Sequence, residues 1–126
     1  MKQKKSTEDY LKVIYLLSQK GEVRGTHIAE QLGVSRPTVS VALKGLEREG
    51  YILMNELRAV TLTEKGRAVA QTMVERHTTF RDLLMSLGID KETASRDACE
   101  MEHSVSAESF EALKTMMVSR ESALNN

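Results

Sequence analysis

The sequence predicts a mainly α fold in which one short β-hairpin interrupts a series of helices. Apolar residues recur at helical spacing through most of the 126-residue chain. Four of the seven glycines separate these periodic segments: Gly21, Gly33, Gly50 and Gly88. Only residues 51–62 show the alternation of apolar and polar residues that is typical of strands.

The first two helices are expected over residues 7–19 and 26–32. The first carries an apolar stripe at helical spacing, formed by Tyr10, Leu11, Ile14 and Leu17. Gly21 ends it. Thr26 is expected to be the N-cap of the second helix, and Gly33 to make the left-handed turn that follows.

A third helix is expected over residues 35–49, with Ser35 as its N-cap. Pro37 falls in its first turn, where a missing amide costs little because those amides have no intrahelical acceptor. Residues 51–62 then predict a two-stranded hairpin. Two apolar pairs alternate around its polar tip: Ile52 with Met54, and Val60 with Leu62.

Helices alone are predicted for the rest of the chain, over residues 63–87, 90–102 and 106–120. The first of them is expected to open at a capping box, Thr61-Leu62-Thr63-Glu64, and to break near His77. We therefore expect two domains, residues 1–62 and 63–126.

The charge distribution separates the two expected domains. Residues 1–62 hold 10 Lys and Arg against 7 Asp and Glu, whereas residues 63–126 hold 8 against 11, although the whole chain is neutral. A basic N-terminal half is a mild indication of a surface that faces phosphates.

Composition favours a cytoplasmic protein. No apolar run approaches the roughly 18–20 residues needed to span a membrane, and the basic N-terminus lacks the apolar region of a secretory signal. A single cysteine cannot form an internal disulfide, which suits a reducing compartment. We expect no membrane partner.

Residues 26–49 show the pattern of a helix–turn–helix. Ala29 is small where two helices would cross, Gly33 makes the turn, and apolar contacts are expected from Ile28, Leu32, Val34, Val39 and Leu43. With the hairpin that follows, this predicts a winged helix–turn–helix, whose second helix enters the major groove of DNA. A purely structural helical hairpin is the alternative, but the turn, the small residue and the polar second helix coincide. The expected DNA contacts are Ser35, Arg36, Pro37, Thr38, Ser40, Lys44 and Arg58.

A thiol, a carboxylate and an imidazole follow at Cys99, Glu102 and His103, spaced i, i+3 and i+4. On a helix these positions share one face, so the three side chains can converge on one divalent cation. Taken singly, the cysteine would more often be a small buried apolar residue, and the other two would be surface residues.

Together, the winged helix and this cluster resemble the diphtheria toxin repressor family of metal-dependent transcriptional regulators. The chain is closest in length to the manganese transport regulators of that family. The matching segments are Thr7-Glu8-Asp9-Tyr10-Leu11 with Ile14-Tyr15, Arg36-Pro37-Thr38-Val39-Ser40, Leu62-Thr63 with Gly66, Arg76-His77, and Cys99 with Glu102-His103.

The resemblance implies a set of metal ligands: Asp9, His77, Cys99, Glu102 and His103. Asp9 matches the manganese-sensing branch, and Cys99 matches the iron-dependent branch. Lys12 stands where the manganese-sensing branch has a glutamate ligand, and Arg81 stands where the family often has another glutamate. Since a cation there would repel a second metal ion, we expect one ion per subunit. Fe(II) is expected first and Mn(II) next, with Co(II), Ni(II) or Zn(II) substituting in vitro.

The resemblance also implies what the protein does. Residues 63–126 would form a helical dimerisation and metal-binding domain, and the homodimer would bind palindromic operator DNA and repress genes of metal-ion uptake. One ion joining Asp9 to the cluster at residues 99–103 would restrict the orientation of the two domains. No small-molecule substrate is expected.

Other classes of function stay open at this point. A metal-independent winged-helix regulator would carry a degenerate site, and a thiol-redox regulator would use an accessible thiol at Cys99. A metalloenzyme is disfavoured because the sequence has no HExxH motif and no pairing of a nucleophile with a base.

Overall fold

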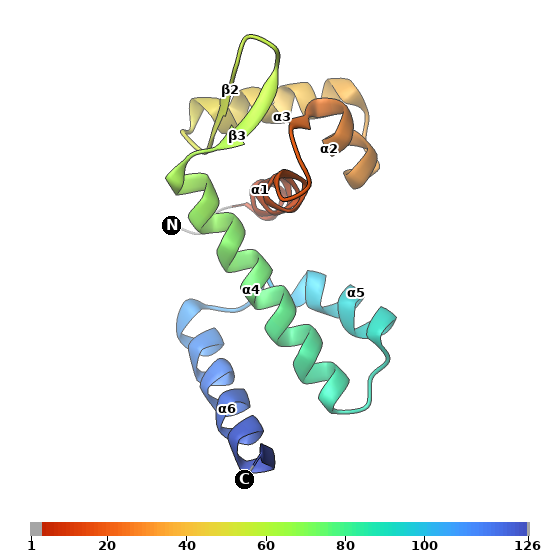
Figure 1. Cartoon of the computed structure of the whole chain (residues 1–126), viewed down its shortest axis with the longest axis vertical. Coiled ribbons are helices and arrows are strands. Elements are labelled where there is room, and N and C mark those ends of the chain that lie inside the picture. The colour runs from red at the N-terminus through yellow and green to blue at the C-terminus, as the bar shows by residue number, and fades with distance from the viewer. Residues whose placement is uncertain (1–3, 126) are drawn as a thin grey trace. The chain divides into compact units, whose positions relative to one another are not determined.

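The computed structural model describes residues 4–125, and its internal contacts divide the chain into two compact units (Figure 1). The first unit ends at Thr72 and the second begins at Met73. This boundary falls inside a helix, α4 (Glu64–Ser86), whereas we expected a domain boundary after Leu62; that functional division stays a prediction. Across residues 4–125, every helix is too short or too polar to cross a membrane.

The first unit consists of three helices and a small sheet, followed by the start of α4. Its elements are α1 (Lys5–Ser18), β1 (Val23–Arg24), α2 (Gly25–Leu32), α3 (Arg36–Arg48), β2 (Ile52–Met54) and β3 (Ala59–Leu62). The expected hairpin is formed by β2 and β3, with Ile52 opposite Leu62. The apolar stripe of the first helix is also as expected, because Tyr10, Leu11 and Ile14 are buried in the core of this unit.

The sheet has a third strand that the sequence did not reveal. β1 pairs antiparallel with β3, placing Val23 opposite Val60, so the order is β1-β3-β2. This pairing keeps Arg24 extended, and α2 therefore begins at Gly25. Thr26 lies inside the helix, so our prediction that it is the N-cap is wrong. Instead, the Arg24 amide donates to Nδ1 of His27 at 3.2 Å.

The helix–turn–helix follows the prediction at its turn. Gly33 adopts a φ of 68°, and Ser35 caps α3 by accepting a hydrogen bond from the Thr38 amide at 3.2 Å. Val39 and Leu43 are buried, as expected. Val34 does not contribute the predicted apolar contact, because it follows the left-handed residue in the turn and remains 38% exposed.

The start of α4 is shifted by two residues from the predicted capping box. Thr61 lies in β3, and Thr63 is the residue whose hydroxyl accepts from the Gly66 amide at 3.1 Å. α4 then continues to Ser86 without the break that we expected near His77. Sharp kinks arise mostly at proline or glycine, and Gly66 in the first turn is the only such residue within this helix.

The second unit packs the rest of α4 against α5 (Lys91–Met101) and α6 (Ala107–Asn125). The buried cluster at its core is formed by Phe80, Ala98 and Phe110, one from each helix, with Met101, Val105 and Leu113 packed against it. The two phenylalanine rings meet edge to face, with centroids 5.7 Å apart. This core fixes α5 beside α4, and both helices carry candidate metal ligands.

Candidate functional site

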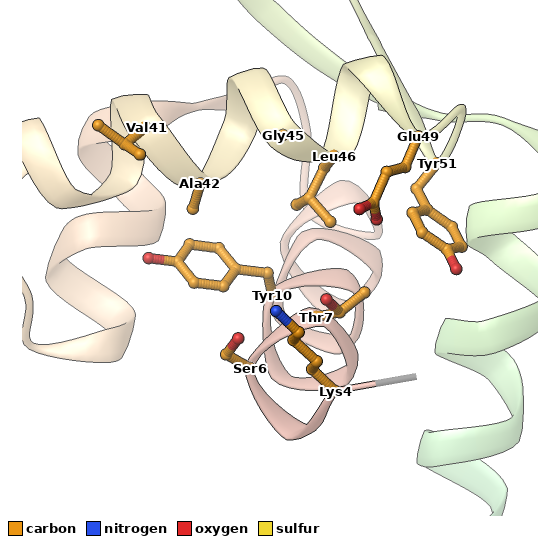
Figure 2. Close-up of a pocket in the computed structure, with 10 residues that line it drawn as sticks. All are labelled: Lys4, Ser6, Thr7, Tyr10, Val41, Ala42, Gly45, Leu46, Glu49 and Tyr51. Carbon is orange, nitrogen blue, oxygen red and sulfur yellow. The ribbon is translucent and has the colours of Figure 1, made fainter. Parts of the chain in front are cut away.

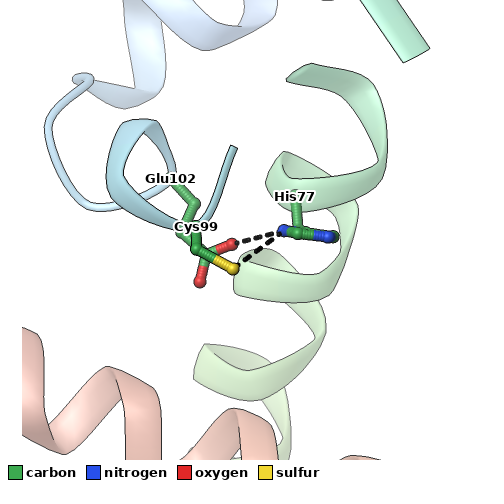
Figure 3. Close-up of side chains that lie close together, drawn as sticks. All are labelled: His77, Cys99 and Glu102. Atoms are coloured by element: carbon green, nitrogen blue, oxygen red, sulfur yellow. Dashed lines mark hydrogen bonds and ion pairs between the residues drawn. The ribbon is translucent and has the colours of Figure 1, made fainter. Parts of the chain in front are cut away.

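Three candidate ligands from the second unit converge on one point (Figure 3). Nδ1 of His77 lies 3.2 Å from Oε2 of Glu102 and 3.7 Å from Sγ of Cys99. His77 projects from α4, Cys99 lies on α5, and Glu102 is the C-cap of α5. One ligand atom from each residue lies within 4.8 Å of the other two, a spacing that one metal ion can bridge.

The Glu102 carboxylate lies between two imidazoles. Its second oxygen, Oε1, is 3.5 Å from Nε2 of His103, and the Glu102 side chain is only 1% exposed. The interpretation of Glu102 and His103 as surface residues is wrong, since both are buried. Cys99 is exposed, so it is not the small buried apolar residue that a lone cysteine would more often be.

The local geometry follows from the sequence spacing. Cys99 and Glu102 are three residues apart at the end of α5, which places them on the same side of the helix. Ala98, one turn before Glu102, is buried in the core with Phe80 of α4, and its small side chain lets α5 lie close to α4. His77 therefore reaches across to the two α5 side chains from the neighbouring helix.

The donor set fits a divalent transition metal. It combines a sulfur, an imidazole nitrogen and a carboxylate oxygen, whereas Mg²⁺ and Ca²⁺ prefer oxygen alone. A carboxylate as buried as Glu102 needs positive charge or donors beside it, because burying an uncompensated charge is costly. The two histidines supply nitrogen atoms at its two oxygens.

Three further residues entered the sequence argument: Asp9, Lys12 and Arg81. Asp9 and Lys12 belong to the first unit, where both are half-buried on α1. Arg81 lies one turn after His77 on α4, and its Nη2 is 3.2 Å from Oδ1 of Asp82. Asp9 stays a proposed ligand on the strength of the resemblance.

In the first unit, a groove runs between α3 and the wing formed by β2 and β3. Four of the predicted DNA contacts line it: Arg36, Ser40, Lys44 and Arg58. All four are exposed, and three are cationic. Arg24 and Thr26 line the same groove but were absent from the prediction. A two-residue strand leaves no periodic signal in the sequence, so nothing indicated that Arg24 would join this surface.

The other predicted DNA contacts lie at the start of α3. Besides accepting the Thr38 amide, the Ser35 hydroxyl lies 2.7 Å from the Thr38 hydroxyl. These two residues therefore build the helix start, together with Pro37 in the first turn, and all three are exposed. They do not line the groove.

The wing tip is held by one asparagine. Oδ1 of Asn55 accepts hydrogen bonds from the amides of Leu57 and Ala59, both at 2.9 Å. Arg58 lies between them with a φ of 63°, a left-handed conformation that is uncommon outside glycine. The turn thus presents Arg58 on the groove in a fixed backbone conformation.

A second pocket of the first unit lies between α1 and the opposite side of α3 (Figure 2). The Tyr10 ring points across it toward Ala42, and burial raises the pKa of the Tyr10 hydroxyl. None of the residues predicted to bind metal or DNA lines this pocket.

Two protein-family models match almost the whole chain. One is described as the iron-dependent repressor N-terminal DNA-binding domain and matches residues 3–60. The other is described as the iron-dependent repressor metal-binding and dimerisation domain and matches residues 63–122.

Curated relatives cover most of the chain. The transcriptional regulator MntR of Salmonella typhimurium is 43% identical over 106 residues, which is 83% of this chain and 68% of the relative. An uncharacterised HTH-type transcriptional regulator of Methanocaldococcus jannaschii is 37% identical over 115 residues, covering 89% of this chain and 92% of the relative.

Solved structures show the same fold. The manganese regulator SloR is 33% identical, with a TM-score of 0.78 over 88% of this chain and 53% of the other. The IdeR protein of T. acidophilum is 27% identical, with a TM-score of 0.74 over 87% and 53%. The chain therefore spans about half the length of these solved structures.

Proposed function

This chain belongs to the iron-dependent repressor, or diphtheria toxin repressor, family of metal-dependent transcriptional regulators, and from that membership we propose that it binds DNA in response to a divalent cation. The observation that carries the proposal is the convergence of His77, Cys99 and Glu102 on one point. The burial of Glu102 between two histidines supports it.

We assign the ligand roles as follows. His77, Cys99, Glu102 and His103 would hold the ion within the second unit, and Asp9 would be a further ligand from the first. When bound, the ion supplies positive charge to the Glu102 carboxylate and a link among its ligands. His77 carries that link to α4, while Cys99 and Glu102 anchor it on α5.

The proposal takes Fe(II) as the first candidate ion and Mn(II) as the second. A thiolate ligand favours Fe(II) and the later metals over Mn(II). The names of relatives such as SloR, a manganese regulator, support Mn(II). One ion per subunit is proposed, because Lys12 and Arg81 would place positive charge where a second ion would sit.

The DNA-binding surface is proposed to be the exposed start of α3 and the groove between α3 and the wing. Arg36, Lys44 and Arg58 place three cations on this groove, which suits the phosphates that flank a major groove. A homodimer would present two such surfaces to a palindromic operator, and metal-uptake genes are the proposed targets of repression. The proposal includes no enzymatic activity.

The test is DNA binding with and without metal. A DNA duplex selected from a random pool in the presence of Mn(II) is titrated with reduced protein, and fluorescence anisotropy reports affinity. We expect Mn(II) or Fe(II) to raise affinity by about 5- to 150-fold over chelator-treated protein. The Glu102→Gln variant should lose this increase, whereas Lys114→Met on α6 should keep it.

The Asp9→Ala variant removes the proposed ligand of the first unit and leaves the four proposed ligands of the second unit unchanged. We expect it to lower the metal-dependent gain in DNA affinity more than it lowers the thermal stability of the apo protein. Equal DNA affinity in metal and in chelator for the wild-type protein would instead support a metal-independent regulator.

A further inference from the structure

We propose that Arg76 is a positioning residue that holds the turn after α5, residues 102–105, against α4 and thereby sets the geometry of the metal site. The inference rests on the proposed metal-dependent function. It assigns a role to a buried cation that lies outside the proposed ligand set.

Arg76 donates hydrogen bonds to the main chain at two places in this turn, Glu102 and Val105. Its Nη1 donates to the Glu102 carbonyl at 3.2 Å and to the Val105 carbonyl at 2.6 Å. The carboxylate of the same Glu102 lies 3.2 Å from Nδ1 of His77. Two consecutive α4 residues therefore hold Glu102 at two points, Arg76 at the main chain and His77 at the side chain.

Neither carbonyl has an intrahelical donor, because one lies at the end of α5 and the other in the connection that follows. Glu102 is the C-cap of α5, and Val105 lies in the connection to α6. The last carbonyls of a helix need donors from elsewhere, and a positive charge there also complements the helix dipole. Arg76 meets both needs from α4, so α5 ends at a fixed place beside His77.

Packing alone does not explain an arginine at this position. The side chain is 8% exposed, with its guanidinium carbon 5.4 Å from the centre of the Phe110 ring. Within residues 4–125, its Nε meets no hydrogen-bond acceptor. At a buried position, a well-packed apolar side chain often gives a fold as stable as a buried charge does. The two carbonyl contacts are therefore the feature that requires a guanidinium here.

The Arg76→Met variant removes both contacts but keeps an unbranched apolar side chain in the space. Lys114→Met is the matched control, because it removes the pairing of Lys114 with Glu75 between α6 and α4 on the surface of the same unit. Reduced, chelator-stripped proteins are titrated with Co(II), whose visible and thiolate charge-transfer absorption report coordination geometry. Mn(II) affinity is measured by competition with a chelator, at a temperature where thermal melts show each variant folded.

We expect Arg76→Met to bind Mn(II) about 10- to 100-fold more weakly than wild type, with an altered Co(II) spectrum. Lys114→Met should match wild type in both. A folded Arg76→Met with wild-type affinity and spectrum would overturn the inference while leaving the metal site in place. If wild type itself shows no saturable binding of either ion, the metal site and this inference both fail.

A second variant, which keeps the positive charge, tests the proposal even if Arg76→Met does not fold. Arg76→Lys retains a buried cation but replaces the planar guanidinium by a compact ammonium on a flexible four-carbon chain. We expect it to fold and to bind Mn(II) with an affinity between those of wild type and Arg76→Met, or at least several-fold below wild type if the methionine variant does not fold. Wild-type affinity and spectrum in Arg76→Lys, with Arg76→Met unfolded, would show that only the charge is needed and would overturn the positioning role.

Discussion

The imidazole of His77 lies 3.2 Å from the carboxylate of Glu102, a side chain that is 1% exposed. The two residues come from different helices, separated by 25 positions in sequence, and Cys99 completes the group at 3.7 Å from the same imidazole nitrogen. This relationship makes Glu102 the centre of the proposed site, because its other oxygen faces His103.

Cys99→Asp should change the metal preference. A carboxylate in place of the thiolate removes the ligand that favours later metals, so the affinity ratio of Co(II) over Mn(II) should fall by about tenfold or more. Chelator competition with the two ions measures the ratio. Ser95→Ala, on the same helix, is the control. An unchanged ratio would mean that the thiol does not ligate the ion.

Lys44→Ala should weaken binding to DNA of any sequence. Lys44 is exposed on the groove between α3 and the wing, where an ammonium suits a phosphate. Affinity should fall uniformly across DNA sequences, and the slope of log affinity against log salt should decrease by roughly one. Lys91→Ala, in the second unit, should leave the slope as it is. A loss confined to one base position would instead assign Lys44 to base readout.

Two glycine substitutions should have opposite effects on stability. A Cβ at Gly66 would lie 2.1 Å from the Tyr51 carbonyl oxygen, so Gly66→Ala must displace main chain and should destabilise the fold by on the order of 2–3 kcal/mol. Gly45 lies inside α3, where an added methyl would meet no atom within 4 Å, and Gly45→Ala should stabilise by about 0.5–1 kcal/mol. Chemical denaturation measures both. A Gly66→Ala variant as stable as wild type would contradict the packing at Gly66, and a destabilised Gly45→Ala would contradict the open space at Gly45.

The contribution of Asp90 to the stability of the fold should depend on pH. Its carboxylate accepts from the Thr93 amide at the start of α5, and this hydrogen bond lowers the pKa of Asp90. A pKa that is lower in the folded state means that the stabilisation is present above the unfolded pKa and is lost as pH falls through the folded one. The gap in Tm between wild type and Asp90→Ala should therefore be wide at pH 7 and shrink below about pH 4. Asp90→Asn keeps a capping oxygen without the charge, and its gap from Asp90→Ala should stay flat with pH.

Local signals predicted most of the first unit. Gly33 and Ser35 mark the turn between α2 and α3, because a left-handed residue and a capping hydroxyl have specific sequence requirements. The third strand escaped prediction, since β1 has two residues and exists only through its pairing with Val60 and Ala59. Thr61 was mistaken for a cap because strand pairing overrides a local capping pattern.

The candidate site also combines residues that local spacing predicts with contacts that depend on the packing of distant segments. The spacing of Cys99, Glu102 and His103 is local, so periodicity predicts one helical face for them. In the structure α5 ends at Met101, so Glu102 is its C-cap and His103 lies in the turn beyond it. His77 joined them only through the family resemblance, because its approach depends on the packing of α4 against α5. The contacts of Arg76 with two carbonyls could not be predicted, since main-chain acceptors leave no trace in the sequence.

The most direct test of the central claim is an anaerobic titration of the reduced, chelator-stripped protein with Fe(II) and Mn(II), for wild type and Glu102→Gln. Stoichiometry, affinity and thermal stability are read together. We predict one equivalent per subunit in wild type, a rise in Tm on binding, and a loss of at least tenfold in affinity without the Glu102 carboxylate. Wild-type protein that binds neither ion, or a Glu102→Gln variant that binds both as wild type does, would contradict the account.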